Sequence, residues 1–193
     1  MERRVYEGRT GVTPYKGGVI PVIETARLRL RAHRREDLPD CVAMWADPNV
    51  VRLITGKPST EQQTWARLLT YLGHWETMGF GYWLAQERES GAFVGEVGLA
   101  DFKRDVAPWM RGLPDIGFAL ASRFHGRGFA TEAAQSVLAW ADANLEFDRT
   151  LCVIDPANAA SLRVAEKCGY EIIERGMYNE QPTLFLARAR RNT

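Results

Sequence analysis

Apolar and charged residues alternate in the first regular segment of the chain, residues 23–31. Its second half is a run in which leucines and arginines take turns: Arg27, Leu28, Arg29, Leu30 and Arg31. Alternation with a period of two predicts a β-strand, with the leucines buried and the arginines forming a solvated face.

Residues 1–22 differ from the rest of the chain because glycine and proline recur in them without a period. This composition is typical of irregular backbone. We therefore expect an irregular N-terminal arm at 1–22 and one domain at 23–193.

Two segments then show helical spacing of apolar residues, which predicts helices over 37–45 and 59–77. The Asp-Pro pair at 47–48 is a stop signal for the first helix. Ser59 and Gln62 have the spacing of a capping box at the start of the second. On that second helix, one apolar stripe is expected to face the core, with a substrate wall as the alternative. Its members are Trp65, Leu68, Leu69 and Leu72.

Strand and helix patterns alternate through the second half of the chain. The predicted strands cover 82–88, 93–99, 116–120, 151–154, 170–174 and 183–187. The predicted helices cover 126–143 and 161–167. On the first of these helices, residues four positions apart are expected to pack on the sheet: Phe129, Ala133, Val137 and Ala141. The fold class is therefore α/β with a mixed sheet.

Composition limits the classes of protein to which the chain can belong. Its 193 residues, of which 46% are hydrophobic, suffice for one domain with its own core. A net charge of +1 provides no overall field for nucleic acid or an anionic membrane. No run approaches the ~18 apolar residues of a spanning helix. We expect a soluble, unexported, cytoplasmic protein with no nucleic-acid or membrane partner.

The cysteines indicate neither a disulfide framework nor a metal site. Cys41, Cys152 and Cys168 are odd in number and lack CxxC or Cys/His spacing. Reduced thiols and no metal are therefore expected.

The most informative stretch is 115–132, a short apolar strand that passes through a basic turn with glycines into a helix. Gly126 and Gly128 lack the side chains that would keep a ligand away from the backbone. The first amides of a helix have no intrahelical partner, and the helix dipole favours negative charge there. The stretch therefore predicts a phosphate-binding site.

Other phosphate-binding motifs fit this turn less well. A Walker loop requires Lys and then Ser or Thr after its last glycine, whereas Phe129 follows Gly128. A dinucleotide fingerprint ends in Gly or Ala, whereas Thr131 stands in that place.

The pattern that remains is R-x-x-G-x-G-x-A at 123–130. With it, the chain resembles the GNAT acyl-CoA N-acetyltransferases, and within them the RimJ/RimL branch. Further segments follow the family's order: IETARLRLR at 23–31, FVGEVGL at 93–99 and NAASLRVAEKCGYE at 158–171. The resemblance covers nearly all of residues 23–187. It implies a GNAT fold, a single domain with a mixed, mostly antiparallel central sheet flanked by helices, with acetyl-CoA held at a splayed strand pair.

The same resemblance implies which residues hold acetyl-CoA. The backbone of the basic turn would bind the pyrophosphate, the strand before it would pair with the pantetheine, and Asn158 would bind the pantetheine. Arg163, on the following helix, is a candidate for the nucleotide phosphate, with a solvated helix surface as the alternative. The candidate cofactor residues are Phe118, Ala119, Leu120, Arg123, His125, Gly126, Arg127, Gly128, Phe129, Ala130, Thr131, Asn158 and Arg163.

Catalysis by direct transfer needs a proton source for the departing thiolate and a base for the amine. Many family members carry a tyrosine acid four positions after the Ser161 position, but this chain has Ala165 there. Ser161, which the resemblance places near the thioester sulfur, is thus the expected proton source. Two residues remain candidates for the base. Asp115 matches an acidic family position, and Glu96 stands between apolar and glycine residues that would desolvate it and raise its pKa.

The acceptor is a primary amine, either a protein N-terminus or a small molecule. In the family's fold the first two helices flank the acceptor cleft, which keeps Trp65, Tyr71 and Trp75 as candidates. An acyl-CoA-binding sensor or partner-binding module without turnover is the alternative. Thioester hydrolysis is a poorer interpretation of the chain, because no Ser-His-Asp triad can be assembled from its histidines. A homodimer is a further expectation, with Trp75 and Trp109 as exposed contact residues.

Overall fold

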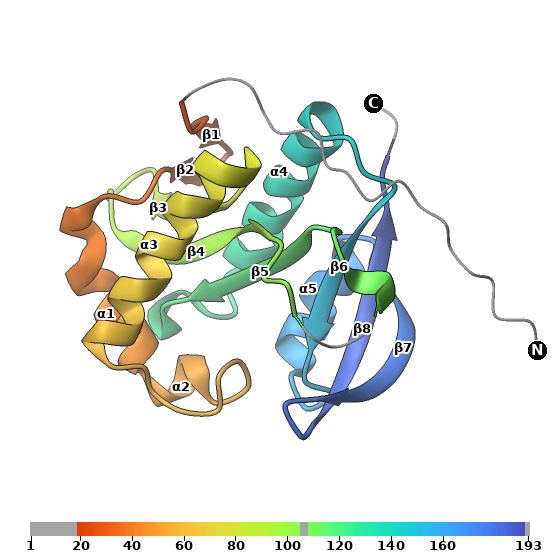
Figure 1. Cartoon of the computed structure of the whole chain (residues 1–193). Coiled ribbons are helices and arrows are strands. Elements are labelled where there is room, and N and C mark those ends of the chain that lie inside the picture. The colour runs from red at the N-terminus through yellow and green to blue at the C-terminus, as the bar shows by residue number, and fades with distance from the viewer. Residues whose placement is uncertain (1–18, 105–107, 192–193) are drawn as a thin grey trace, which may run out of the picture.

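The computed structural model describes residues 19–104 and 108–191 of the chain. It shows one α/β domain whose eight-stranded sheet has the order β1-β2-β3-β4-β5-β6-β8-β7 (Figure 1). The strands are β1 (Ile23–Glu24), β2 (Leu28–Arg31), β3 (Tyr82–Glu87), β4 (Phe93–Ala100), β5 (Asp115–Leu120), β6 (Arg149–Ile154), β7 (Glu171–Tyr178) and β8 (Gln181–Ala189). The α-helices are α1 (Leu38–Ala46), α2 (Pro48–Val51), α3 (Glu61–Met78), α4 (Phe129–Asn144) and α5 (Ala159–Lys167). Most of the predicted N-terminal arm, residues 1–18, lies outside the described residues.

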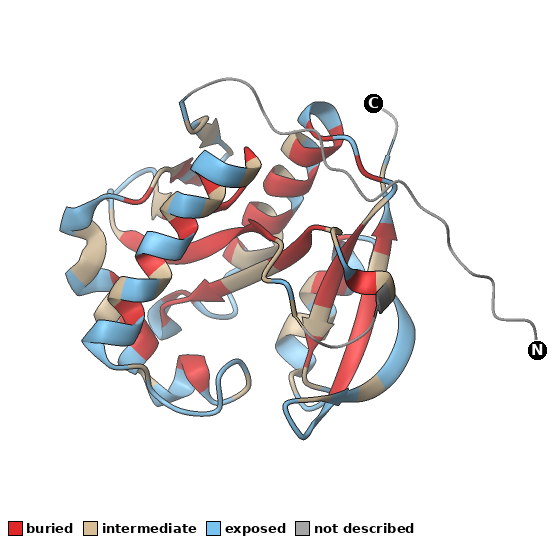
Figure 2. Cartoon of the chain, in the orientation of Figure 1, coloured by how far each residue is buried: buried red, intermediate tan, exposed pale blue. Residues whose placement is uncertain are grey.

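Helices cover both faces of the sheet. In Figure 1, α1 and α3 lie in front of it and α4 lies behind. Burial follows this arrangement, because the strands between the layers are buried while the outer helix surfaces are exposed (Figure 2). Within the described residues, no helix is both long and apolar enough to cross a membrane.

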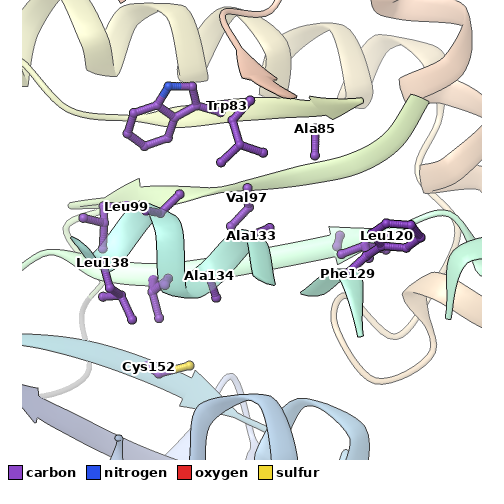
Figure 3. Packing of buried hydrophobic residues seen from close by; sticks show 14 of the residues in the cluster. Trp83, Ala85, Val97, Leu99, Leu120, Phe129, Ala133, Ala134, Leu138 and Cys152 are labelled. Atoms are coloured by element: carbon purple, nitrogen blue, oxygen red, sulfur yellow. The ribbon is translucent and has the colours of Figure 1, made fainter. Parts of the chain in front are cut away.

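The core is densest where α4 packs on the middle strands. Phe129, Ala133, Val137 and Ala141 are all buried, as the four-residue interval predicts. Small side chains on this helix let it approach the sheet closely, and Figure 3 shows Ala133 and Ala134 beside Val97.

The first predicted strand is instead a short hairpin. The segment turns at Thr25, whose amide donates to the Leu28 carbonyl at 2.9 Å, and Ile23 then pairs with Leu30. Leu28 and Leu30 are fully buried, as predicted. The expectation of a solvated arginine face was wrong for Arg31, because it forms a half-buried ion pair with Asp37 at 2.7 Å.

The cap of α3 lies one residue beyond the prediction. Thr60 rather than Ser59 is the N-cap, and it exchanges capping-box hydrogen bonds with Gln63 rather than Gln62. The spacing of the capping box is as predicted, shifted by one residue.

The buried face of α3 also differs from the predicted stripe. Leu69 is 48% exposed, and the buried residues are Thr64, Leu68, Tyr71 and Trp75. Trp75 is therefore not an exposed contact residue: its ring packs edge-on against Trp83 and Trp140, and its Nε1 donates to the Tyr82 carbonyl at 3.0 Å.

Candidate active site

The sheet opens between β5 and β6, which is its parallel strand pair. Asp115 and Leu151 form the one register pair between these strands, whereas β4 and β5 are paired along their length. Beyond that pair the strands run apart (Figure 1). Gly117 and Phe118 are partly exposed in the middle of β5, as expected for backbone that faces an opening. This is the splayed strand pair that the family resemblance implied.

Parallel strands send their following loops to the same edge of the sheet. The glycine-bearing turn follows β5, and the segment with Asn158 follows β6. Both therefore flank the open end of the splay, although 28 or more residues separate them in the chain.

The glycine turn presents the free amides of α4. Its N-cap is Gly128, in the left-handed region with φ +81°, and Gly126 is also left-handed with φ +73°. The first helical hydrogen bond of α4 runs from the Glu132 amide to the Gly128 carbonyl at 3.1 Å. The amides of Phe129, Ala130 and Thr131 precede this bond, so they are available to an anion.

The basic side chains of the turn are partly engaged within the protein. Arg123 donates to the Phe93 carbonyl at 3.0 Å, and His125 Nε2 lies 2.8 Å from the Leu120 carbonyl. Arg127 pairs with Glu87 at 3.0 Å. These contacts fix the shape of the turn and leave the first backbone amides of α4 as the candidate anion site.

Asn158 is the N-cap of α5. Its Oδ1 accepts from the Ser161 amide at 3.0 Å, and its Nδ2 donates to the Leu53 carbonyl at 3.3 Å. Ser161, half-buried, follows in the first turn of α5, while Arg163 is exposed. Ala165, at the position of the family's tyrosine, is buried.

Asp115 lies at the closed end of the splay and is 7% exposed, so it is not a strand-end group in water. Arg104 Nε donates to its Oδ2 at 3.0 Å and the same guanidinium contacts Tyr178 at 3.4 Å. Burial raises the pKa of Asp115 to about 6, although the Arg104 charge acts in the opposite direction. Neither Arg104 nor Tyr178 could be predicted from a sequence pattern, because a loop and the pairing of distant strands bring them to Asp115.

Glu96 is also buried, at 2% exposure, but the expectation of a raised pKa was wrong. Burial alone would raise the pKa, yet His33, Trp45 and Cys41 all donate hydrogen bonds to this carboxylate and together hold its pKa below the usual value. Trp45 Nε1 lies 2.8 Å from Oε2, and His33 Nε2 lies 3.3 Å from Oε1. Glu96 is thus an anchored carboxylate between the sheet and α1.

The same cluster contains side chains of metal-ligand type. Atoms of His33, Cys41 and Glu96 all lie within 4.8 Å of one another and all three residues are buried. Spacing along the chain gave no sign of this group. Hydrogen bonds to the Glu96 carboxylate account for the arrangement of all three.

The aromatic candidates for the acceptor cleft have separate environments. Trp65 is half-buried, and Tyr71 is buried in a stack on Tyr82, with ring centroids 4.2 Å apart. Trp109, half-buried, donates from Nε1 to Glu174 of β7 at 3.1 Å.

Comparison with known proteins agrees with this geometry. Residues 27–171 match the family described as Acetyltransferase (GNAT) domain. The uncharacterized protein YkkB of Bacillus subtilis is 30% identical over 75% of this chain and 82% of its own length. The FsC-acetyl coenzyme A-N(2)-transacetylase of Aspergillus fumigatus is 28% identical over 80% of this chain and 66% of its own.

Solved structures share the fold. A protein described as a GNAT-family acetyltransferase, from Bordetella pertussis, superposes with a TM-score of 0.78 at 30% identity, covering 88% of this chain and 99% of that one. RimL, a ribosomal L7/L12 alpha-N-protein acetyltransferase solved with coenzyme A, has a TM-score of 0.73 over 90% of this chain and all of its own. Its identity is 15%, so it supports the fold alone.

Proposed function

The chain belongs to the GNAT family and is an N-acetyltransferase, and we propose that it transfers the acetyl group of acetyl-CoA to a primary amine, on a small molecule or a protein N-terminus. One observation carries the proposal. The splay between β5 and β6 is bordered at its open end by the free amides of α4 and at its closed end by the buried carboxylate of Asp115.

In this proposal the pyrophosphate of the donor binds the first amides of α4, beside the turn formed by Gly126 and Gly128. The pantetheine lies along Phe118 to Leu120, on the edge of β5 that is no longer paired with β6. Asn158 borders the same channel from the β6 side. The thioester then lies near the closed end of the splay, which brings it to Asp115.

Asp115 is the base in this proposal. With a pKa of about 6 it is ionised at neutral pH and yet more basic than an ordinary aspartate. It takes a proton from the acceptor ammonium, the nitrogen lone pair forms the C–N bond, and the C–S bond breaks with its electron pair left on sulfur. The nitrogen, now bonded to the acetyl carbon, loses its second proton, which passes through Ser161 to the thiolate, and Asp115 releases the first proton to solvent. Glu96 keeps its three hydrogen-bond donors and acts as an anchor.

The proposal includes two classes of acceptor, a small-molecule amine and a protein N-terminus. The Aspergillus relative is named for N(2)-transacetylation, and RimL is named as a protein N-terminal acetyltransferase. These names span both acceptor classes that the sequence left open.

Thiol release from acetyl-CoA, measured with a panel of small amines and of peptides with free N-termini, tests the proposal. Amine-dependent release is expected. Tight binding of acetyl-CoA without release for any acceptor would favour the sensor reading, and absence of binding would refute both.

A further inference from the structure

Tyr82 of β3 lies across the sheet in a space that glycines leave open. Tyr82 pairs in register with Gly98 of β4, and Gly98 pairs with Gly117 of β5. A Cβ atom at Gly98 would approach Cγ of the Tyr82 ring to 2.8 Å, and a Cβ atom at Gly117 would overlap the Tyr82 hydroxyl. The side chain therefore spans β4 and carries its hydroxyl to β5.

Packing fixes the ring of Tyr82, whereas its hydroxyl has no hydrogen-bond partner among the described residues. Tyr82 is 7% exposed, and its ring stacks on Tyr71 with an interplanar angle of 5°. In the described residues, the enclosed side-chain polar atoms without a partner are His33 Nδ1 and Arg188 Nε. The Tyr82 hydroxyl is not one of them, yet no hydrogen bond involves it, so its oxygen meets accessible space.

That oxygen lies at the closed end of the splay. Gly117 is two residues from Asp115, and alternate residues of a strand share a face. The Tyr82 hydroxyl and the Asp115 carboxylate therefore lie on the same face of β5, close to where β5 leaves β6. Burial first, and then the Asp115 charge, raises the pKa of Tyr82, so the phenol stays protonated.

A purely structural role leaves this arrangement unexplained. Strand-interior glycines weaken a sheet relative to alanine, and they commonly mark a close approach of a ligand or another backbone. Phenylalanine would fill the stack on Tyr71 equally well. The glycine at 117 makes room specifically for the phenolic oxygen.

We propose that Tyr82 is a residue of the acceptor site, whose hydroxyl oxygen accepts a hydrogen bond from the acceptor nitrogen and holds it against Asp115. This inference rests on the proposed function. Arg104 occupies Oδ2 of Asp115, which leaves Oδ1 for a second N–H of the same ammonium. An ammonium has N–H donors for both oxygens, so the pair holds the protonated amine and aims its nitrogen at the thioester.

The first test is Tyr82→Phe, with Tyr170→Phe as the control because it removes a buried phenolic hydroxyl that is already bonded to Thr150. We expect Tyr82→Phe to lower kcat/KM for the acceptor amine by about 10- to 100-fold, the usual effect of losing a hydrogen bond to a charged group. The KM for acetyl-CoA should stay at that of the unaltered enzyme, and the melting temperature should fall no further than in Tyr170→Phe. Turnover in the unaltered enzyme tests the proposed function separately.

The second test uses the contact with Gly117. Gly117→Ala should displace the hydroxyl and lower kcat/KM as Tyr82→Phe does, and the double variant should lose little more than either single one. Unchanged acceptor kinetics in Tyr82→Phe, or independent and additive losses in the double variant, would overturn the assignment. Equal losses of kcat/KM in Tyr82→Phe and Tyr170→Phe would reduce Tyr82 to a packing residue.

Discussion

The carboxylate of Glu132 holds the side chain of Arg27, with Nε and Nη2 of the guanidinium both 2.7 Å from Oε2. Its other oxygen accepts from the Thr25 hydroxyl at 2.6 Å and from the Arg27 amide at 2.8 Å. Arg27 Nη1 in turn donates to the Arg127 carbonyl at 2.9 Å. One carboxylate in the first turn of α4 thus joins the β1–β2 turn to the turn that presents the amides.

Replacing Glu132 by alanine should lower the free energy of unfolding by about 1–2 kcal/mol and raise the KM for acetyl-CoA, because the turn loses its brace. Denaturant unfolding and initial rates measure the two effects. Glu89→Ala, a change at an exposed glutamate of the β3–β4 turn, serves as the control. A fall in stability with an unaltered KM would show that the brace does not shape the donor site.

The same carboxylate predicts a pH dependence of stability. Burial alone would raise the pKa of Glu132, but hydrogen bonds from Thr25 and Arg27 outweigh it, so the folded-state pKa lies below its usual 4.5. A carboxylate whose pKa is lower in the folded than in the unfolded state stabilises the fold at pH values above its unfolded-state pKa. This stabilisation is lost as the pH falls through the folded-state pKa. The difference in melting temperature between the unaltered protein and Glu132→Gln should therefore shrink as pH falls below about 4.5. A difference that is constant across this range would contradict the ion pair.

The raised pKa of Asp115 predicts how turnover depends on pH. If it is the base, kcat/KM for the amine should rise as pH increases through about 6, where Asp115 ionises. Asp115→Asn should remove this limb and reduce turnover by about 10²- to 10³-fold. Glu96→Gln is the comparison, since it should mainly destabilise the fold. The opposite result, with the limb lost only in Glu96→Gln, would transfer the base role to Glu96.

Gly126 allows the phosphate site to be tested without a clash inside the protein. A Cβ atom there has nothing within 4 Å, and the same is true of Gly56, which has a similar φ of +76° far along the chain. Each change to alanine strains the backbone by roughly 1–2 kcal/mol. Calorimetry should show weaker CoA binding in Gly126→Ala only. Equal CoA affinities in the two variants would remove the pyrophosphate from this turn.

Ser161 and Asn158 should affect different kinetic constants. Ser161→Ala is expected to lower kcat by about 10²-fold with little change in acetyl-CoA binding, because its hydroxyl acts on charge that appears as the thiolate leaves. Asn158→Ala should weaken donor binding and also destabilise α5 by about 1 kcal/mol, since it removes the cap. Asn158→Asp retains a capping group and separates the two effects. Normal turnover in Ser161→Ala would leave water as the proton source.

Elements with a strong local pattern could be predicted from the sequence. The β3–β4 hairpin, α4 with its buried face and α5 all lie within a few residues of the structure. Their periodicity is internal to each segment, so no distant contact is needed to define it. The N-cap of α3 was missed by one residue because Ser59 and Thr60 are both good caps.

Contacts that depend on how distant strands and helices pair could not be predicted in this way. The pKa of Glu96 depends on Trp45 and His33, which other segments bring to it. The Tyr82 hydroxyl reaches Gly117 across an intervening strand. A single sequence contains the residues of such contacts but not the pairing that joins them.

Because β5 and β6 share a single register pair, a donor bound in the proposed site would become a structural component of the sheet. The strands β1 to β5 and the strands β6, β8 and β7 meet in that parallel pair, which is the narrowest junction of the sheet. A pantetheine along Phe118 to Leu120 would extend the junction with backbone hydrogen bonds, so we expect the two parts of the sheet to exchange amide protons as separate units without donor and as one unit with it. The resistance of this enzyme to unfolding should then rise with the logarithm of the donor concentration, which links its persistence to the supply of activated acetyl groups.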